Sequence, residues 1–384
     1  MRHSPDHAWA RPLTLAEKLW RVDWVVLAVA GAIAAIGSMT LYSVAGGSFQ
    51  PWAERHALRF LGGCAVVLAM ALVTPRIWLQ LAYPVYGVAL VLLALVPVVG
   101  SEALGARRWL SVGGMSFQPS ELMKVALVAA LARYYHWLAP ARVSRPLWVA
   151  IALAIILVPV ALTMAQPDLG TALMFVMLGL ALMFLAGVSW FIFAAAGVAC
   201  VLALPYAWDA LHGYQRRRIE TFLDPDSDPL GAGYHINQSK IALGSGGIDG
   251  KGYMRGTQSH LEFLPEKHTD FIFTMFGEEW GLIGAIGLMA LYALLIFLAL
   301  RMAWRSRSHF GRLSAAGLAI TLFAYVFINV AMVTGLVPVV GVPLPLMSYG
   351  GSAVISLMAA LGLAMSPHVH GRQRPSRDQI GPFW

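Results

Sequence analysis

The sequence predicts an all-α polytopic membrane protein with about ten transmembrane helices and a long loop between the seventh and the eighth. Three observations support this fold class. The chain of 384 residues is 59% hydrophobic and only 12% charged, whereas about a quarter of the residues of a soluble domain are charged. The apolar residues form runs of about 20, the length of a helix that crosses a bilayer. The basic residues gather in the links between alternate runs.

Applied in order, the window of about 20 apolar residues gives ten candidate spans. Before the first of them, segment 1–23 carries apolar residues at helical spacing beside Lys18 and Arg21, which predicts a short interfacial helix. The whole of 1–384 is interpreted as a single membrane domain. The expected spans are 24–43, 57–74, 77–99, 119–138, 147–165, 170–187, 190–208, 271–300, 313–337 and 349–366.

The basic residues predict the orientation of the chain. Clusters of Arg and Lys precede the first span, follow the last, and lie between spans 4 and 5 and between spans 8 and 9. With ten spans all four clusters fall on one face, which the positive-inside rule makes cytoplasmic. Both termini, including the tail 367–384, are therefore expected in the cytoplasm, and the loop 209–270 on the extracytoplasmic side of the plasma membrane.

The loop 209–270 has the features of a functional segment. Long loops without a role are uncommon in compact proteins. Its stretch 233–243, GYHINQSKIAL, predicts a short helix lying on the membrane surface. Lys240 and the other loop cations, together with Gln258 and His268, suit a polyanionic ligand better than they suit the topology rule.

Arg107 and Arg108, in the motif GARRWL, also lie on the extracytoplasmic side, against the charge rule. A guanidinium group binds phosphate through two parallel hydrogen bonds, so these arginines are candidates for a phosphate-bearing substrate. The alternative is anchoring to lipid headgroups.

The motif QPSELMK begins the fourth span. Pro119 suits the first turn of a helix, and Glu121 and Lys124 lie one turn apart on one face. An ionisable pair inside a membrane span indicates function by default, although the two charges could merely neutralise each other. Gln118 and Ser120 of the same motif are further candidates for substrate binding.

Two acids head later spans. Asp168, in QPDLGTAL, precedes the sixth span and is a candidate either for the site or for a helix N-cap. Asp270, in LEFLPEKHTDFIF, lies on the last turn before the eighth span, where burial and nearby cations tune the proton affinity of a carboxylate. Capping is the alternative for Asp270 too. The sequence has no HExxH, no Cys/His cluster and no GxSxG, which disfavours metal hydrolysis and serine acyl transfer.

Five motifs together resemble those of the bacterial SEDS family (shape, elongation, division and sporulation). They extend from residue 105 to 352, over most of the chain, and the form of the stretch before HTDFIF resembles the elongation branch of the family more than the division branch. The motifs are GARRWL, FQPSELMK, QPDLGTAL, GTQSHLEFLPEKHTDFIF and PLPLMSYGGS.

The resemblance implies an inner-membrane peptidoglycan glycosyltransferase that polymerises lipid II during cell elongation and rod-shape maintenance. It also implies work with a class B penicillin-binding protein and other membrane proteins of the elongation complex, and no nucleic acid. The acid of the TDFIF motif, here Asp270, is the family's catalytic candidate, expected to act as general base with undecaprenyl diphosphate as leaving group. Glu121, Lys124, Arg107 and Arg108 match residues that line the family's outer cavity or its margin.

Three expectations stay open at this point. A divalent cation such as Mg²⁺ or Mn²⁺ could assist, although nothing in the sequence specifies a metal site. A lipid II flippase would also use many spans with charged residues, but the span centres are nearly free of charge, which favours chemistry at the outer surface. A non-catalytic scaffold for wall-synthesis enzymes is the third possibility.

Overall fold

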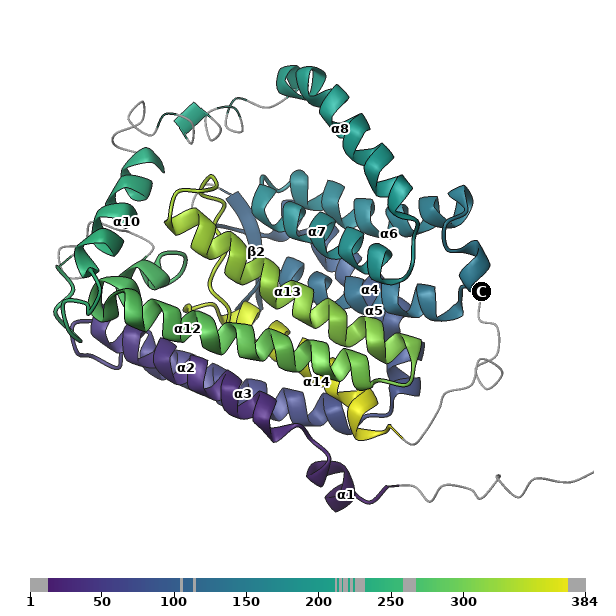
Figure 1. Ribbon diagram of the computed structural model, residues 1–384, viewed down its shortest axis with the longest axis horizontal. Coiled ribbons are helices and arrows are strands. Elements are labelled where there is room, and N and C mark those ends of the chain that lie inside the picture. The colour runs from purple at the N-terminus through teal and green to yellow at the C-terminus, as the bar shows by residue number, and fades with distance from the viewer. Residues whose placement is uncertain are drawn as a thin grey trace, which may run out of the picture.

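The protein is a bundle of long helices with a small sheet at one end (Figure 1). The structure, a computed structural model, describes residues 13–371 except 104–105, 113–114, 211–212, 214–215, 217–219, 222–223, 225–231 and 258–266.

Each of the ten predicted spans corresponds to one helix of the described chain, which confirms the predicted all-α polytopic membrane fold. Seven of these helices are long and apolar enough to cross a membrane, while α7 and the first part of α8 are shorter apolar helices. The ten are α2 (Trp24–Val44), α3 (Ala53–Leu72), α4 (Pro75–Val99), α5 (Pro119–Trp137), α6 (Pro146–Met164), α7 (Leu169–Leu185), α8 (Trp190–Ala210), α12 (Ile272–Arg305), α13 (His309–Val333) and α14 (Gly351–Val369).

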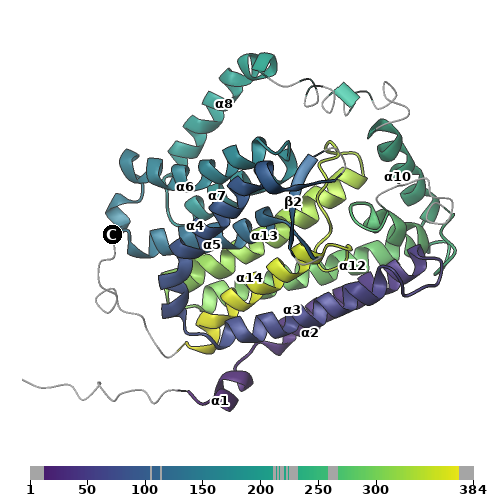
Figure 2. The same ribbon diagram turned by 180° about the vertical axis from the view of Figure 1, so that it is seen from behind.

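Helices α5, α13 and α14 form the inside of the bundle. Most of their side chains are buried. In Figures 1 and 2, α2, α3 and α12 lie along one side of them and α4, α6 and α7 along the other, while α8 slants away from the bundle. Small residues allow close approach: a Cβ on Gly317 of α13 would lie 2.5 Å from Val128 of α5. Charged residues on α5 therefore face protein and not lipid.

The remaining elements are short. The interfacial helix expected in the N-terminal segment is present as α1 (Leu15–Trp20), which Thr14 and Glu17 begin with a capping box. A helix is present where one was expected within 233–243, as α10 (Ala232–Gly246). A single 3-10 turn, η1 (Pro140–Arg142), links α5 to α6.

The motif GARRWL lies on a strand, which the sequence analysis did not predict. Strands β1 (Ser101–Ala103), β2 (Ala106–Val112) and β3 (Met115–Phe117) form an antiparallel sheet in the order β1-β2-β3. We call the end of the bundle that carries this sheet, α10 and residues 267–271 the loop end. Helix α1 lies at the opposite end (Figure 1).

Helix α12 is not the continuous apolar helix that the eighth predicted span suggests. It contains Glu278 and Glu279, both buried, and it breaks at Gly281, where φ is 62° and ψ is −163°. Residues 247–252, which follow α10, supply the missing backbone partners. The N–H groups of Leu282 and Ile283 donate to the carbonyls of Gly247 and Ile248 at 3.0 and 3.2 Å, and those of Lys251 and Gly252 donate to the carbonyls of Glu278 and Glu279, both at 3.0 Å.

The two buried acids of α12 have polar partners. The Nζ of Lys251 lies 2.6 Å from Oε1 of Glu278, which also accepts hydrogen bonds from the Thr257 N–H and hydroxyl at 2.9 and 3.0 Å. The Ser43 hydroxyl donates to Glu279. A buried carboxylate without such partners would be strongly destabilising, so these contacts make acids possible inside the span and fasten segment 247–257 to α12.

We predict that Gly281→Ala lowers the thermal unfolding temperature of the purified protein in detergent. This backbone conformation is open to glycine almost alone, and forcing another residue into it costs about 1–3 kcal/mol. A Cβ there would also lie 2.3 Å from the Gly250 nitrogen. Gly287→Ala is the matched control, because Gly287 lies in the same helix with open space around it. Equal unfolding temperatures for the two variants would contradict the docking of segment 247–252 in the break.

Candidate active site

Asp270 lies at the loop end, two residues before α12 begins at Ile272 and one residue before its N-cap residue, Phe271. Its side chain is half-buried. A Cβ placed on Gly341 would lie 3.5 Å from Oδ2 of Asp270, so the carboxylate points toward the segment that links α13 to α14. Gly341 itself is exposed and has φ 71°. The acid therefore borders an open part of the surface.

The backbone that carries Asp270 is held from α13 and from the α13–α14 link. The carbonyls of residues 268–270 each accept one hydrogen bond from those elements. In chain order the donors are the Tyr349 N–H at 2.9 Å, the Ser348 hydroxyl at 2.6 Å and the Asn329 side-chain amide at 2.8 Å. These bonds fix the path of the chain up to the catalytic candidate.

A second polar group lies in the first turns of α5. Lys124 donates to Oε1 of Glu121 at 2.7 Å, and the hydroxyl of Tyr325 in α13 donates to Oε2 at 2.5 Å. Lys124 also contacts the Tyr325 hydroxyl. All three residues are at most 5% exposed. The predicted pair is thus an ion pair closed into a triangle by a tyrosine, and the third N–H of the ammonium group stays available for another acceptor.

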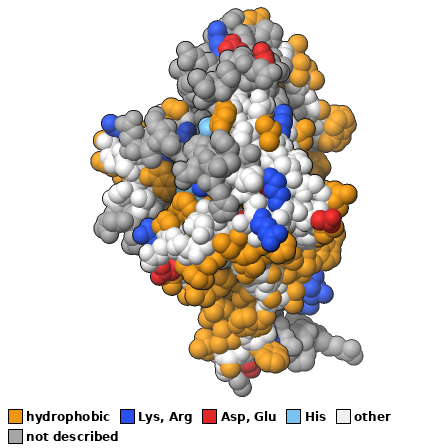
Figure 3. All heavy atoms as spheres, turned by 90° about the vertical axis from the view of Figure 1, so that its left-hand side faces the viewer, with side chains coloured by type: hydrophobic (Ala, Val, Ile, Leu, Met, Phe, Trp, Pro, Cys, Tyr) orange, Lys and Arg blue, Asp and Glu red, His pale blue; other side chains and the backbone are white. Residues whose placement is uncertain are grey.

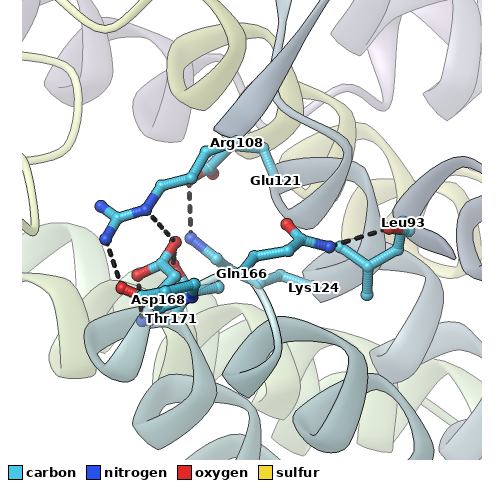
Figure 4. Close-up of polar contacts among 8 residues, drawn as sticks. Leu93, Arg108, Glu121, Lys124, Gln166, Asp168 and Thr171 are labelled. Carbon is cyan, nitrogen blue, oxygen red and sulfur yellow. Dashed lines mark hydrogen bonds and ion pairs between the residues drawn. The ribbon is translucent and has the colours of Figure 1, made fainter. Parts of the chain in front are cut away.

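Asp168 and Arg108 form a third group, drawn beside the Glu121–Lys124 pair in Figure 4. Asp168 caps α7 by accepting from the Thr171 N–H at 3.2 Å and its hydroxyl at 2.9 Å. The Nε of Arg108 lies 4.0 Å from the same carboxylate, and the guanidinium donates to the Pro167 carbonyl at 2.5 Å. Asp168 is therefore both the helix cap and the anchor that holds Arg108 of β2 at this site.

Helix α13 brings the first two groups together. Tyr325 and Asn329 are four residues apart, on one face of the helix and about 6 Å along its axis. Tyr325 binds the α5 pair and Asn329 binds the backbone of Asp270. The start of α7 meets the same place, because a Cβ on Gly170 would lie 2.6 Å from the Val340 carbonyl. Candidates from distant motifs thus converge at the loop end.

The other candidates lie around this centre. Gln118 is the N-cap residue of α5, without a side-chain capping bond, and Ser120 is buried beside the ion pair. Arg107 is exposed and donates to the Pro97 carbonyl at 3.4 Å.

Candidates from the long loop lie on the other side of Asp270. His268 stacks on Trp52 with ring centroids 4.6 Å apart. Lys240 is exposed, and a Cβ on Gly335 would lie 2.2 Å from its Cε, so its stem packs over the end of α13. Gln258 lies outside the described residues. Seen from this side, Lys and Arg side chains are spread over the face, with two of them next to each other to the right of its centre (Figure 3).

Several residues of the site were not among the candidates predicted from the sequence. Tyr325 and Asn329 are polar residues within an apolar run, and polar residues inside a membrane span often indicate a functional site. Arg59 of α3 places its guanidinium carbon 4.5 Å from the centre of the Tyr349 ring, and no local motif marks this contact. Long-range contacts of this kind are not visible in sequence spacing.

Between α5, α13 and α14 there is a cavity of about 20 Å³ bordered by Lys124 and Tyr325. This volume holds about one water molecule, so no larger ligand fits inside this cavity. Among the described residues, no three His, Cys, Asp or Glu side chains come together as a metal-binding group.

Comparison with known proteins places the chain among wall-synthesis enzymes. The family model FTSW_RODA_SPOVE, described as cell cycle protein, matches residues 18–373. The "Peptidoglycan glycosyltransferase MrdB" of Escherichia coli (strain K12) is 45% identical over 351 residues, which cover 91% of this chain and 94% of that protein. A "Probable peptidoglycan glycosyltransferase FtsW" of Alkalilimnicola ehrlichii is 37% identical over 383 residues, which cover 94% of this chain and 92% of that protein.

Two solved structures are similar. One comes from work on the "structural coordination of polymerization and crosslinking by a peptidoglycan synthase complex"; its TM-score is 0.79 at 34% identity, with 90% of this chain and 97% of that chain covered. The other is the Rod shape determining protein RodA of Thermus thermophilus, with a TM-score of 0.69 at 30% identity and 92% and 98% coverage.

We predict that Lys124→Met destabilises the protein more than the double variant Glu121→Gln/Lys124→Met. Removing one partner of a buried ion pair leaves an uncompensated charge and costs about 3–5 kcal/mol, whereas removing both leaves none. Thermal unfolding in detergent of the two variants and the wild type is the measurement. A double variant that unfolds at the temperature of Lys124→Met, or below it, would show that the pair is not the stabilising unit described.

Proposed function

The chain belongs to the FtsW/RodA/SpoVE family of cell cycle proteins, which confirms the resemblance to the SEDS proteins. From this membership we propose how it works as a peptidoglycan glycosyltransferase of the elongation type. It polymerises glycan strands from lipid II, and Asp270 is the general base. The observation that carries this assignment is the position of Asp270: its backbone is bound by α13 and the α13–α14 link, while its carboxylate borders the exposed Gly341.

The reaction is a single displacement. Asp270 takes the proton from a GlcNAc hydroxyl of one lipid-linked substrate as that oxygen attacks the anomeric carbon of the MurNAc of the other. The bond to undecaprenyl diphosphate breaks, and the α-linked sugar becomes β-linked. Because diphosphate is already a competent leaving group, one carboxylate suffices, and inversion needs no second carboxylate as nucleophile.

Basic side chains neutralise the departing diphosphate in this mechanism. Lys124 is buried with Glu121 and Tyr325, so it contributes positive charge from behind the open face and not through a direct contact. Arg108 is aimed at the same place by Asp168, and Arg107 lies beside it on β2. Fixed cations placed where negative charge develops stabilise a transition state without reorganisation. Among the described residues, no group of three His, Cys, Asp or Glu side chains could hold Mg²⁺ or Mn²⁺, and the cations of this mechanism are Lys and Arg side chains.

The remaining candidates fit the acceptor and its surroundings. Gln118, Ser120, His268 and Gln258 offer hydrogen bonds to sugar hydroxyls, and Lys240 adds a cation above the end of α13. In this assignment the loop end faces the extracytoplasmic side and both termini are cytoplasmic, as the basic links between the spans suggest. No nucleic acid takes part.

A crosslinking partner follows from the nature of the product. Glycan strands must be crosslinked to carry load. The solved structure with a TM-score of 0.79 comes from a peptidoglycan synthase complex that coordinates polymerization and crosslinking. We assign the partner role to a class B penicillin-binding protein, with further membrane proteins of the elongation complex around the pair.

We predict that Asp270→Asn lowers lipid II polymerisation by about 10²- to 10⁴-fold, the usual contribution of a general base, while the protein stays folded. The measurement is gel-resolved polymerisation of labelled lipid II by the purified protein, together with a class B penicillin-binding protein whose transpeptidase serine is inactivated. Asp249→Asn is the control, because Asp249 is an exposed acid in the turn after α10.

Wild-type rates for Asp270→Asn would overturn the assignment of the base. If the wild type formed no glycan chains, but liposomes containing it moved lipid II between leaflets, the flippase would replace the enzyme. If the wild type formed no glycan chains, and Asp270→Asn disturbed assembly with the penicillin-binding protein, the non-catalytic scaffold would replace the enzyme.

A further inference from the structure

Asn329 connects the two non-helical segments that meet beside the candidate base. Its side chain is fully buried in α13. The amide nitrogen donates to the Asp270 carbonyl at 2.8 Å and to the Val342 carbonyl at 2.7 Å. Both partners are acceptors only, so the amide nitrogen and not its oxygen must face them, and both of its hydrogens are used.

This bridge fixes the separation between the Asp270 and Val342 carbonyls, and with it the position of the Asp270 carboxylate. Val342 follows Gly341, whose backbone lies next to Oδ2 of Asp270. By holding the carbonyls of Asp270 and Val342 on one amide group, Asn329 fixes the carboxylate against the exposed edge of the α13–α14 link. It does so from behind, because a fully buried side chain cannot touch the substrate.

The α13–α14 link is also attached without Asn329. The Tyr292 hydroxyl donates to the Pro345 carbonyl at 2.5 Å, and the imidazole of His56 contacts the Leu346 carbonyl at 3.0 Å. Ser348 and Tyr349 bind the residues just before Asp270. Loss of Asn329 should therefore leave the link in place and release only the spacing between Asp270 and Val342.

We propose that Asn329 is a positioning residue that aligns the general base for glycosyl transfer. The inference rests on the proposed function, since it gives Asn329 a role only if Asp270 is the base. A reacting group that is misplaced by about 1 Å can cost about 10²-fold in rate. Such a residue affects the chemical step and leaves the binding of substrate unchanged.

The test is a series of variants at position 329 that keep four side-chain heavy atoms and the branch at Cγ. Asn donates two hydrogen bonds, and Asn329→Leu donates none. Asn329→Asp donates one, because an acid buried among carbonyl oxygens stays protonated. Ser366→Ala is the control: Ser366 is equally buried and its hydroxyl also donates to a backbone carbonyl, that of Val73 at 2.7 Å, but at the opposite end of the bundle.

Steady-state polymerisation of lipid II by the purified full-length protein with its partner gives kcat and KM, and thermal unfolding reports folding. We expect kcat to fall by about 10- to 100-fold in Asn329→Leu and by less in Asn329→Asp. KM should stay within about twofold of wild type, as expected when only the chemical step is affected. Ser366→Ala should keep the wild-type kcat.

Wild-type kcat in a folded Asn329→Leu protein would overturn the inference. So would a loss of kcat accompanied by an equal rise of KM and a lower unfolding temperature, which indicates a structural role alone. If Asn329→Leu does not fold, Asn329→Asp is the deciding variant. Wild-type kcat in Asn329→Asp would show that the two hydrogen bonds donated by Asn329 are not needed, and would overturn the inference. Normal activity of Asp270→Asn would instead refute the assignment of Asp270 as the base, whereas an inactive Asp270→Asn beside an unaffected Asn329 series refutes the positioning role only.

Discussion

Backbone that leaves a helix inside a membrane protein must find its hydrogen-bond partners within the protein, because lipid offers none. At the loop end the protein meets this constraint by pairing irregular segments with one another. Residues 268–270 and the α13–α14 link satisfy each other through Asn329, Ser348 and Tyr349. Where Gly281 interrupts α12, segment 247–252 supplies the missing partners. The candidate active site is built on the first of these pairings, so its geometry follows from the need to hydrogen-bond the backbone carbonyls of these segments.

Buried charge imposes a second constraint of the same kind. An ion pair away from water is tolerated only when additional hydrogen bonds complete it. Lys124 and Glu121 are completed by Tyr325, and Glu278, the partner of Lys251, is completed by the Thr257 N–H and hydroxyl. Each group joins elements that are far apart in the sequence. The group around Glu278 holds the segment after α10 to α12, as the backbone bonds there do, and the group around Glu121 holds α5 to α13.

The sequence was sufficient for the features that depend on local composition. Runs of apolar residues gave the helices to within a few residues, because the bilayer thickness sets their length. The break at Gly281 was hidden, because a glycine within an apolar run also fits a continuous helix. The contact of Tyr325 with the α5 pair was hidden for another reason: it depends on chain segments that only the folded bundle brings together. The sheet carrying Arg108 is local, but two of its three strands have only three residues and give no clear alternation in the sequence. Candidate residues were therefore predictable one by one, and their convergence was not.

Helix α13 gives this convergence its precision. Tyr325 and Asn329 project from one face on successive turns, so the separation between the cation they help to hold and the acid they help to align is set by the rise of a rigid helix. Residues on a packed helix hold a site more accurately than residues on a loop. Any shift of α13 moves both side chains together and preserves their spacing. An acid that lies outside any helix is thereby positioned by a helix, as the proposed role of Asp270 in glycosyl transfer requires.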